Sequence, residues 1–273
     1  MSENLVRADV ALVSRGLTTS RQRAQQFIEQ QQVLLNGKIL KKSAVRVSEA
    51  DQLEVIGPDL PYVSRGGLKL EKALHVFDVS PRDRVCLDIG ASTGGFTDVL
   101  LRNGAKVVYA VDVGTGQLSP SIAANPRVLS MENVNARHLT PDMFPSTPDL
   151  TVIDVSFISL RLILPAVFAS MKDSGCVITL IKPQFEAGPS AIGKNGIITN
   201  PAVHTAVLEE LISFPETLGW RFTHLDFSPI AGGSGNIEFL ARLTPLSAPE
   251  QPNLNSREIQ NLVAKAHRCL KTR

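Results

Sequence analysis

The chain has 273 residues, of which 43% are hydrophobic, so it can form one large globular domain together with a small one. Its three cysteines, Cys86, Cys176 and Cys269, lie far apart and without metal-ligand spacing, so we expect neither a disulfide framework nor a metal site. The first residues lack a signal-peptide pattern and no segment resembles a membrane span, so we expect a soluble, cytoplasmic protein without membrane association.

The net charge of +2 conceals an uneven distribution. Residues 1–47 hold eight Lys or Arg against three acids, and the last 18 residues hold five against Glu258 alone. Two basic ends around a mildly acidic middle are typical of a protein that holds a polyanion at its ends. Ordinary solvated basic faces remain an open alternative.

Residues 1–57 have the pattern of a small mixed domain. Apolar residues at helical spacing predict helices over residues 5–13 and 21–31. Asn36-Gly37 lies between two apolar pairs and predicts a β-hairpin, because both residues of such a tight turn need a positive φ. A further strand is predicted over residues 52–56.

This order of helix, helix, Asn-Gly hairpin and strand resembles the S-four-type RNA-binding domain. Gln32 stands where that family usually has a glycine before the hairpin. The resemblance implies RNA binding, although a module that binds protein stays open. The basic residues expected to contact RNA are Arg7, Arg15, Arg21, Arg23, Lys38, Lys41, Lys42 and Arg65.

A proline-containing linker is expected over residues 58–64, a large domain over residues 65–245, and a basic extension with an amphipathic helix over residues 246–273. In the large domain, apolar strands alternate with helical segments. This predicts an α/β fold with a mostly parallel, Rossmann-like sheet covered on both faces. The expected strands are residues 85–89, 107–112, 128–131, 150–155, 176–181, 222–227 and 237–243.

The first of these strands runs into a glycine-rich turn, which predicts a nucleoside site at the carboxyl ends of the strands. No Gly-Lys-Ser/Thr follows, so a Walker phosphate loop is excluded. Asp88 suits a cationic ligand end such as the methionine ammonium of S-adenosylmethionine, and Asp112 can accept both hydroxyls of a ribose. NAD remains the competing cofactor. The expected cofactor-binding residues are Asp88, Gly90, Ser92, Thr93, Gly94, Gly95, Phe96, Asp112, Asn133 and Asp154.

Four charged residues occupy positions where an apolar strand or its flank should need none: Lys69, Asp154, Lys182 and Glu238. Buried ions are costly unless they are paired, and the carboxyl ends of parallel strands line the active crevice. We therefore expect the four to lie together as a catalytic group.

Their order resembles that of the FtsJ-type ribose 2′-O-methyltransferases, and the strings SRGGLKL, DIGASTGGFTDVLL, DVSFISL, LIKPQFE and GNIEFL resemble the TlyA family. This resemblance runs through nearly the whole chain. It implies a methyltransferase that uses S-adenosylmethionine to methylate cytidine 2′-hydroxyls of ribosomal RNA in ribosomal subunits. The implied substrates are 23S rRNA and, for longer members, 16S rRNA, with an effect on capreomycin susceptibility.

Several points stay open at this stage. A haemolysin and a catalytically inactive RNA-binding ribosome factor are the alternatives, and a monomer is favoured. Phe157 is expected near the methyl pocket or in the core, and Phe185 on a flipped base or in the core. We also hypothesise that Pro58 and Pro61 stiffen the linker and couple RNA docking to assembly of the site.

Overall fold

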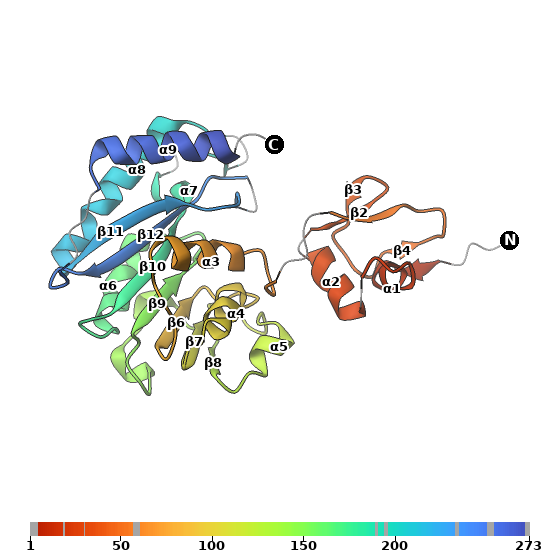
Figure 1. Ribbon diagram of the computed structural model, residues 1–273, viewed down its shortest axis with the longest axis horizontal. Helices are drawn as coiled ribbons and strands as arrows, with labels where there is room; N and C mark the ends of the chain where they lie inside the picture. The colour runs from red at the N-terminus through yellow and green to blue at the C-terminus, as the bar shows by residue number, and fades with distance from the viewer. Residues whose placement is uncertain are drawn as a thin grey trace. The chain divides into compact units, whose positions relative to one another are not determined.

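The computed structural model describes residues 5–18, 20–29, 31–56, 61–188, 191–193, 196–232, 235–249 and 254–270. It divides the chain into two compact units, Met1–Arg65 and Gly66–Arg273 (Figure 1). Residues 58–60 of the predicted linker, including Pro58, lie outside the described residues, so its suggested coupling role stays a prediction.

The N-terminal unit packs two helices against small antiparallel sheets. Its elements are β1 (Val6–Arg7), α1 (Ala8–Ser14), α2 (Arg21–Glu29), β2 (Val33–Leu35), β3 (Lys38–Ile39), β4 (Arg46–Val47) and β5 (Leu53–Val55). Strand β2 lies between β3 and β5, and β1 pairs with β4. The first helix begins at Ala8 rather than at residue 5, because Val6 pairs with Val47 across the small sheet. A two-residue strand gives no periodic signal in the sequence.

The predicted hairpin is confirmed. Asn36 and Gly37 have φ of 50° and 77°, as a two-residue turn with positive φ at both positions requires. The left-handed residue after α2 is Gln31, with φ of 57°. Gln32 is buried and its N–H donates to the Phe27 carbonyl at 2.8 Å. The positive φ therefore lies one residue before Gln32, which explains how the domain does without a glycine there.

The C-terminal unit is built on a seven-stranded sheet of order β11-β12-β10-β9-β6-β7-β8. Its strands are β6 (Val85–Ile89), β7 (Val107–Val111), β8 (Val128–Met131), β9 (Leu150–Ile153), β10 (Cys176–Ile181), β11 (Trp220–Phe227) and β12 (Phe239–Pro245). The five strands from β10 to β8 are parallel, while β12 and β11 close one edge antiparallel (Figure 1). The predicted Rossmann-like α/β fold class is confirmed.

Helices cover both faces of this sheet. They are α3 (Gly67–Val76), α4 (Gly95–Arg102), α5 (Pro120–Ala123), α6 (Leu164–Ala169), α7 (Pro183–Glu186), α8 (Pro201–Ile212) and α9 (Ser256–Leu270). Leu87 and Ile89 share a core with α6, α8 and α9. Asp88 points to the opposite face, where it meets Thr97 of α4. The carboxyl edge of the sheet is thereby flanked by helices on either side.

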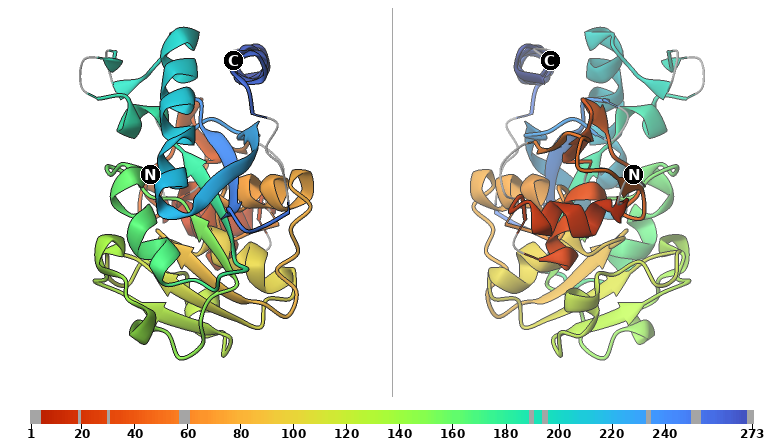
Figure 2. Two further views of the ribbon diagram at one scale, coloured as in Figure 1. Left: turned by 90° about the vertical axis from the view of Figure 1, so that its left-hand side faces the viewer. Right: turned by 90° about the vertical axis from the view of Figure 1, so that its right-hand side faces the viewer.

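The predicted amphipathic helix of the basic extension is α9. Its Ile259, Val263 and Ala266 are buried against the same core as α8, and Figure 2 shows α9 nearly along its axis beside α8. His204 of α8 and His267 of α9 meet at 2.8 Å between ring nitrogens. No described helix is both long and apolar enough to span a membrane.

Candidate active site and nucleic-acid interface

A cavity opens at the carboxyl ends of β6, β7 and β9. Strand β6 has β7 on one side and β9 on the other, so the chain reverses its direction of travel across the sheet at this point. The cavity measures about 350 Å³, the size of a small-molecule site. Its lining includes Gly90, Ser92, Asp112, Gln117, Asn135, Asp154, Ser156 and Phe157.

The glycine-rich turn lets the backbones of β6 and β9 approach each other closely. Gly90 has φ of 82°, and a Cβ there would lie 2.5 Å from the carbonyl oxygen of Asp154. Ser92 also has a positive φ, and its N–H donates to Asp112 Oδ2 at 2.8 Å. Gly94, with φ of 92°, is the N-cap residue of α4. The turn is therefore fixed by tight backbone contacts that leave the cavity open beside Gly90.

Asp88 lies beneath this turn with no exposed surface. Its Oδ2 accepts a hydrogen bond from Thr97 Oγ1 at 2.6 Å, while Oδ1 has no partner among the described residues. Burial raises the pKa of the Asp88 carboxyl to about 7, with the nearby Asp154 and Asp112 adding to the effect. A buried carboxylate with one unsatisfied oxygen fits a site that receives a cationic ligand group, although Asp88 does not line the cavity.

Asp112 directly follows β7 and lines the cavity. Its two carboxylate oxygens accept hydrogen bonds from the N–H groups of Ser92 and Gly114, each at 2.8 Å. Each oxygen keeps lone pairs for a further donor such as a ribose hydroxyl. Of the predicted segment that follows β8, Asn135 lines the cavity and Asn133 does not. Thr93, Gly94, Gly95 and Phe96 likewise form the turn and the start of α4 rather than the lining.

The four predicted catalytic residues lie together in a row of alternating charges, Glu238, Lys69, Asp154 and Lys182, called the charge chain below. Lys69 Nζ is 2.6 Å from Glu238 Oε2 and 4.0 Å from Asp154 Oδ2. Lys182 Nζ is 2.6 Å from Asp154 Oδ1. The side chains of both lysines and of Glu238 are at most 10% exposed. Two positive and two negative groups compensate each other, as ions removed from water must.

The secondary structure next to each residue of the charge chain places it at the carboxyl edge of the sheet. Lys182 directly follows the fully buried β10, and Asp154 directly follows the fully buried β9. Lys69 is one of the buried residues in the first turn of α3. Glu238 directly precedes β12, and a Cβ on Gly232 would collide with its carboxylate. Asp154 belongs both to the charge chain and to the cavity lining, so it joins the two parts of the site.

Ser156 is a site residue that the sequence reasoning missed. Lys182 Nζ donates a hydrogen bond to Ser156 Oγ at 3.0 Å, and Ser156 lines the cavity. The contact of Lys182 with Asp154 Oδ1 is closer, but it is an ion pair without hydrogen-bond geometry. The available signal was spacing, because alternate residues of an extended segment share one face and Ser156 follows Asp154 by two.

An aromatic pair stands beside the charge chain. Phe157 is 90% exposed and has a left-handed φ of 64°, so the structure excludes it from the core. Its ring centroid lies 5.0 Å from that of Phe185, and both rings line a hollow of about 590 Å³. Glu186 holds the loop, since its carboxylate accepts from Ser159 Oγ at 2.6 Å and from the Leu160 N–H at 2.8 Å.

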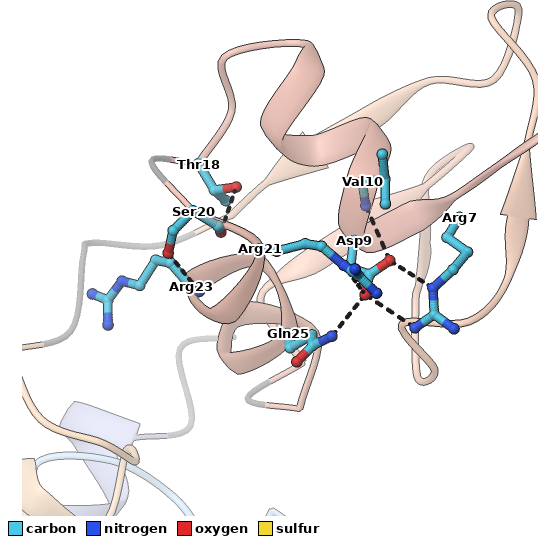
Figure 3. Close-up of polar contacts among 8 residues, drawn as sticks. All are labelled: Arg7, Asp9, Val10, Thr18, Ser20, Arg21, Arg23 and Gln25. Atoms are coloured by element: carbon cyan, nitrogen blue, oxygen red, sulfur yellow. Dashed lines mark hydrogen bonds and ion pairs between the residues drawn. The ribbon is translucent and has the colours of Figure 1, made fainter. Parts of the chain in front are cut away.

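In the N-terminal unit, the fully buried Asp9 organises two of the predicted RNA-binding arginines (Figure 3). Arg7 donates to both its carboxylate oxygens at 3.0 Å, and Arg21 and Gln25 donate at 3.2 and 2.7 Å. The Arg7 guanidinium is the main reason that the pKa of Asp9 is held well below its usual range. Arg7 and Arg21 remain 39% and 57% exposed, so each still offers a charged edge to solvent.

Arg15, also among the predicted RNA-binding residues, makes hydrogen bonds within the domain. Its two terminal nitrogens donate to the carbonyls of Asp51 and Ser48 at 2.6 and 2.7 Å, so its guanidinium stabilises the domain's own backbone. Arg23 lies over the Phe27 ring at 4.8 Å. The remaining predicted cations are exposed: Lys38, Lys41, Lys42 and Arg65. The first three of these line a groove along the hairpin with Leu35 and Ile39.

A Rossmann-like sheet with a small-molecule cavity and buried lysine–acid pairs at its carboxyl edge is typical of an α/β enzyme. Residues 62–244 match the model of the FtsJ-like methyltransferases, and residues 6–53 match the S4 domain. The chain belongs to the FtsJ-like methyltransferase family, in a form that carries an N-terminal S4 domain.

Curated and solved relatives agree with this assignment. A Bacillus subtilis protein named YqxC and described as an rRNA methyltransferase is 47% identical, over 99% of this chain and 97% of its own. The 16S/23S rRNA (cytidine-2′-O)-methyltransferase TlyA of Mycobacterium tuberculosis is 42% identical, over 85% and 87%. A solved structure from Streptococcus thermophilus, described as a hemolysin, has a TM-score of 0.78 at 47% identity, over 98% and 97% of the chains. The predicted resemblance to the TlyA family is confirmed.

Proposed function

We propose that this protein transfers a methyl group from S-adenosylmethionine to the ribose 2′-hydroxyl of a cytidine in ribosomal RNA. The observation that carries the proposal is the alternating chain of Glu238, Lys69, Asp154 and Lys182 beside the cavity. The TlyA relative is named for this reaction on 16S and 23S rRNA, and it covers most of this chain.

The cavity residues fit the proposed cofactor. Asp112 can accept the ribose hydroxyls of a nucleoside, and the open backbone at Gly90 leaves room for an extended ligand next to Asp154. The unpartnered Asp88 Oδ1 favours a cationic ligand nearby. When bound, S-adenosylmethionine supplies an activated methyl group carried on a sulfonium.

The charge chain can prepare the accepting hydroxyl. Lys182 steers the 2′-oxygen and, as the neutral amine, takes its proton when the new carbon–oxygen bond forms, while Asp154 holds the resulting ammonium beside the cavity. Lys69, paired with Glu238, places a second positive charge 4.0 Å from Asp154. Alignment of this kind can lower the barrier by as much as about 7–11 kcal/mol in favourable intramolecular cases.

The RNA contacts are divided between the two units. The exposed lysines and arginines of the S4 domain supply affinity for phosphates, which carries no sequence information directly. Phe157 and Phe185 offer aromatic faces beside the charge chain, and splayed RNA bases stack on such faces. We therefore assign docking to the N-terminal unit and choice of the nucleotide to the site on the C-terminal unit.

Tritiated-methyl transfer to separated small and large ribosomal subunits from cells without this modification tests the proposal. We expect wild-type protein to label 23S rRNA, or both 16S and 23S rRNA, at a cytidine ribose. Lys182→Ala should lose transfer yet bind S-adenosylhomocysteine normally, while Lys106→Ala, which changes an exposed lysine, should act as wild type. Transfer by Lys182→Ala at the wild-type rate would overturn the assignment of Lys182.

The Lys182→Ala variant also tests the alternative that the protein is a haemolysin. Two relatives described as hemolysins match most of this chain, one of them a solved structure with this fold, and no described helix is suited to cross a membrane. If purified wild-type protein and Lys182→Ala lyse erythrocytes equally while methyl transfer separates them, lysis is unrelated to the charge chain.

A further inference from the structure

The amine of Lys182 is held by two contacts of different kinds. Asp154 supplies a close ion pair at 2.6 Å, whose energy depends weakly on direction. Ser156 Oγ supplies the one hydrogen bond that Lys182 Nζ makes among the described residues, at 3.0 Å. A hydrogen bond prefers an angle above about 150° and weakens steeply when it is bent. Charge therefore places this amine near Asp154, while Ser156 sets its orientation.

We infer that Ser156 is a positioning residue, which turns the Lys182 amine toward the ribose hydroxyl that is methylated. A terminal amine rotates about its last carbon–nitrogen bond, so attraction to Asp154 alone leaves its hydrogens free to turn, and with them the lone pair of the neutral amine that accepts the proton. The tetrahedral nitrogen has three positions besides its bond to carbon. One N–H is directed to Ser156 and a second position faces Asp154, so the third is left for the 2′-oxygen. The inference rests on the proposed function.

Ser156 keeps the same protonation state throughout the proposed methyl transfer. The 2′-oxygen forms its bond to the methyl carbon as its proton passes to Lys182, and the electron pair of the methyl–sulfur bond stays on sulfur. Ser156 accepts an N–H from the lysine before and after this transfer, because both the amine and the ammonium are donors. It therefore neither gains nor loses a proton, and its contribution lies in geometry.

The backbone around Ser156 makes this contact reproducible. Asp154 is fixed to β6 by its N–H, which donates to the Ile89 carbonyl at 2.9 Å. On the other side of the loop, Glu186 accepts from Ser159 and Leu160, and Glu186 lies only four residues after Lys182. The loop that carries Ser156 is thus fixed to β6 at its start and to the segment after Lys182 at its end.

Serine and threonine variants of Ser156 test the inference. Removal of a positioning contact at a reacting group can lower turnover by roughly 10- to 100-fold. We expect Ser156→Ala to lower kcat of methyl transfer by this amount, with KM for ribosomal subunits and Kd for S-adenosylhomocysteine within about twofold of wild type. Ser156→Thr keeps the hydroxyl and should recover to within about threefold. Ser130→Ala, on the exposed face of β8, is the matched control.

Two results would overturn the inference. One is turnover by Ser156→Ala within about twofold of wild type, since a contact of this kind should be worth roughly tenfold or more. The other is equal loss in the alanine and threonine variants together with weaker binding of S-adenosylhomocysteine, which would make Ser156 part of the cavity wall. Failure of the proposed function is distinguishable, because in that case the wild-type protein itself transfers no methyl group.

Discussion

Substitution of Gly90 by alanine separates backbone strain from a collision at the active site. Gly90 and Gly104 have nearly equal left-handed φ, 82° and 86°, so alanine costs about 1–2 kcal/mol of strain at either position. A Cβ at Gly104 meets its neighbours at 3.6 Å or more, an ordinary contact. At Gly90 it would lie 2.5 Å from the Asp154 carbonyl oxygen, so that backbone must move by at least half an ångström to reach 3.0 Å.

The displaced residue carries the carboxylate that pairs with Lys182. Overpacking of this sort costs about 1–3 kcal/mol beyond the strain. A displacement approaching 1 Å at a reacting group costs on the order of 100-fold in rate. We expect Gly90→Ala to lower the midpoint of thermal unfolding further than Gly104→Ala, to weaken binding of S-adenosylhomocysteine and to reduce methyl transfer by roughly 10- to 100-fold. Equal effects of the two substitutions in these three assays would refute the argument.

Two further predictions concern pH. Burial raises the pKa of Asp88 to about 7, so the folded protein retains a proton that the unfolded chain releases near pH 4, and stability falls as pH rises through this interval. Asp88→Asn should remove that dependence in thermal unfolding without ligand, and parallel profiles would contradict it. Asp9 has the opposite effect on the pH dependence of stability. Its pKa is depressed chiefly by Arg7, so the stabilisation that it provides is present above about pH 4 and is lost as the pH falls below that value. Asp9→Asn should speed hydrogen exchange of residues 5–56 at neutral pH, with a difference that shrinks in acid; a constant difference would argue against the ion pairs.

Periodicity and turn chemistry predicted most of the fold. Strands β6, β8 and β10 begin and end where expected. For β6 and β10 the reason is that parallel strands buried on both faces are continuous apolar runs with sharp polar ends. The sheet edge was predicted less well. Strand β11 begins two residues early at Trp220, whose ring stacks on Phe168, a tertiary contact that has no local signal.

The charged residues of the site were predictable for a different reason from the polar ones. Lys69, Asp154, Lys182 and Glu238 interrupt apolar sequence, and their cost when buried marks them. Ser156 carries no such cost, so apart from its spacing two residues after Asp154, its role emerges from the 3.0 Å contact with Lys182. Glu186 is a partly buried charged residue, but its partners Ser159 and Leu160 are 26 or more residues away in sequence, so its contacts have no local signal.

The buried pair of Lys69 and Glu238 argues that the carboxyl edge is shaped for chemistry rather than for stability. Replacement of a buried ion pair by apolar residues of similar volume is often neutral or stabilising, because desolvation opposes the attraction between the charges. A fold under pressure for stability alone would have leucine-like residues at both positions, as it has along β9 and β10. The position of Asp154 explains why the pair is present, because Asp154 faces Lys182 on one side and Lys69 on the other. Without Glu238 to hold Lys69, two lysines would compete for one carboxylate, and the position of Lys182 would no longer be defined.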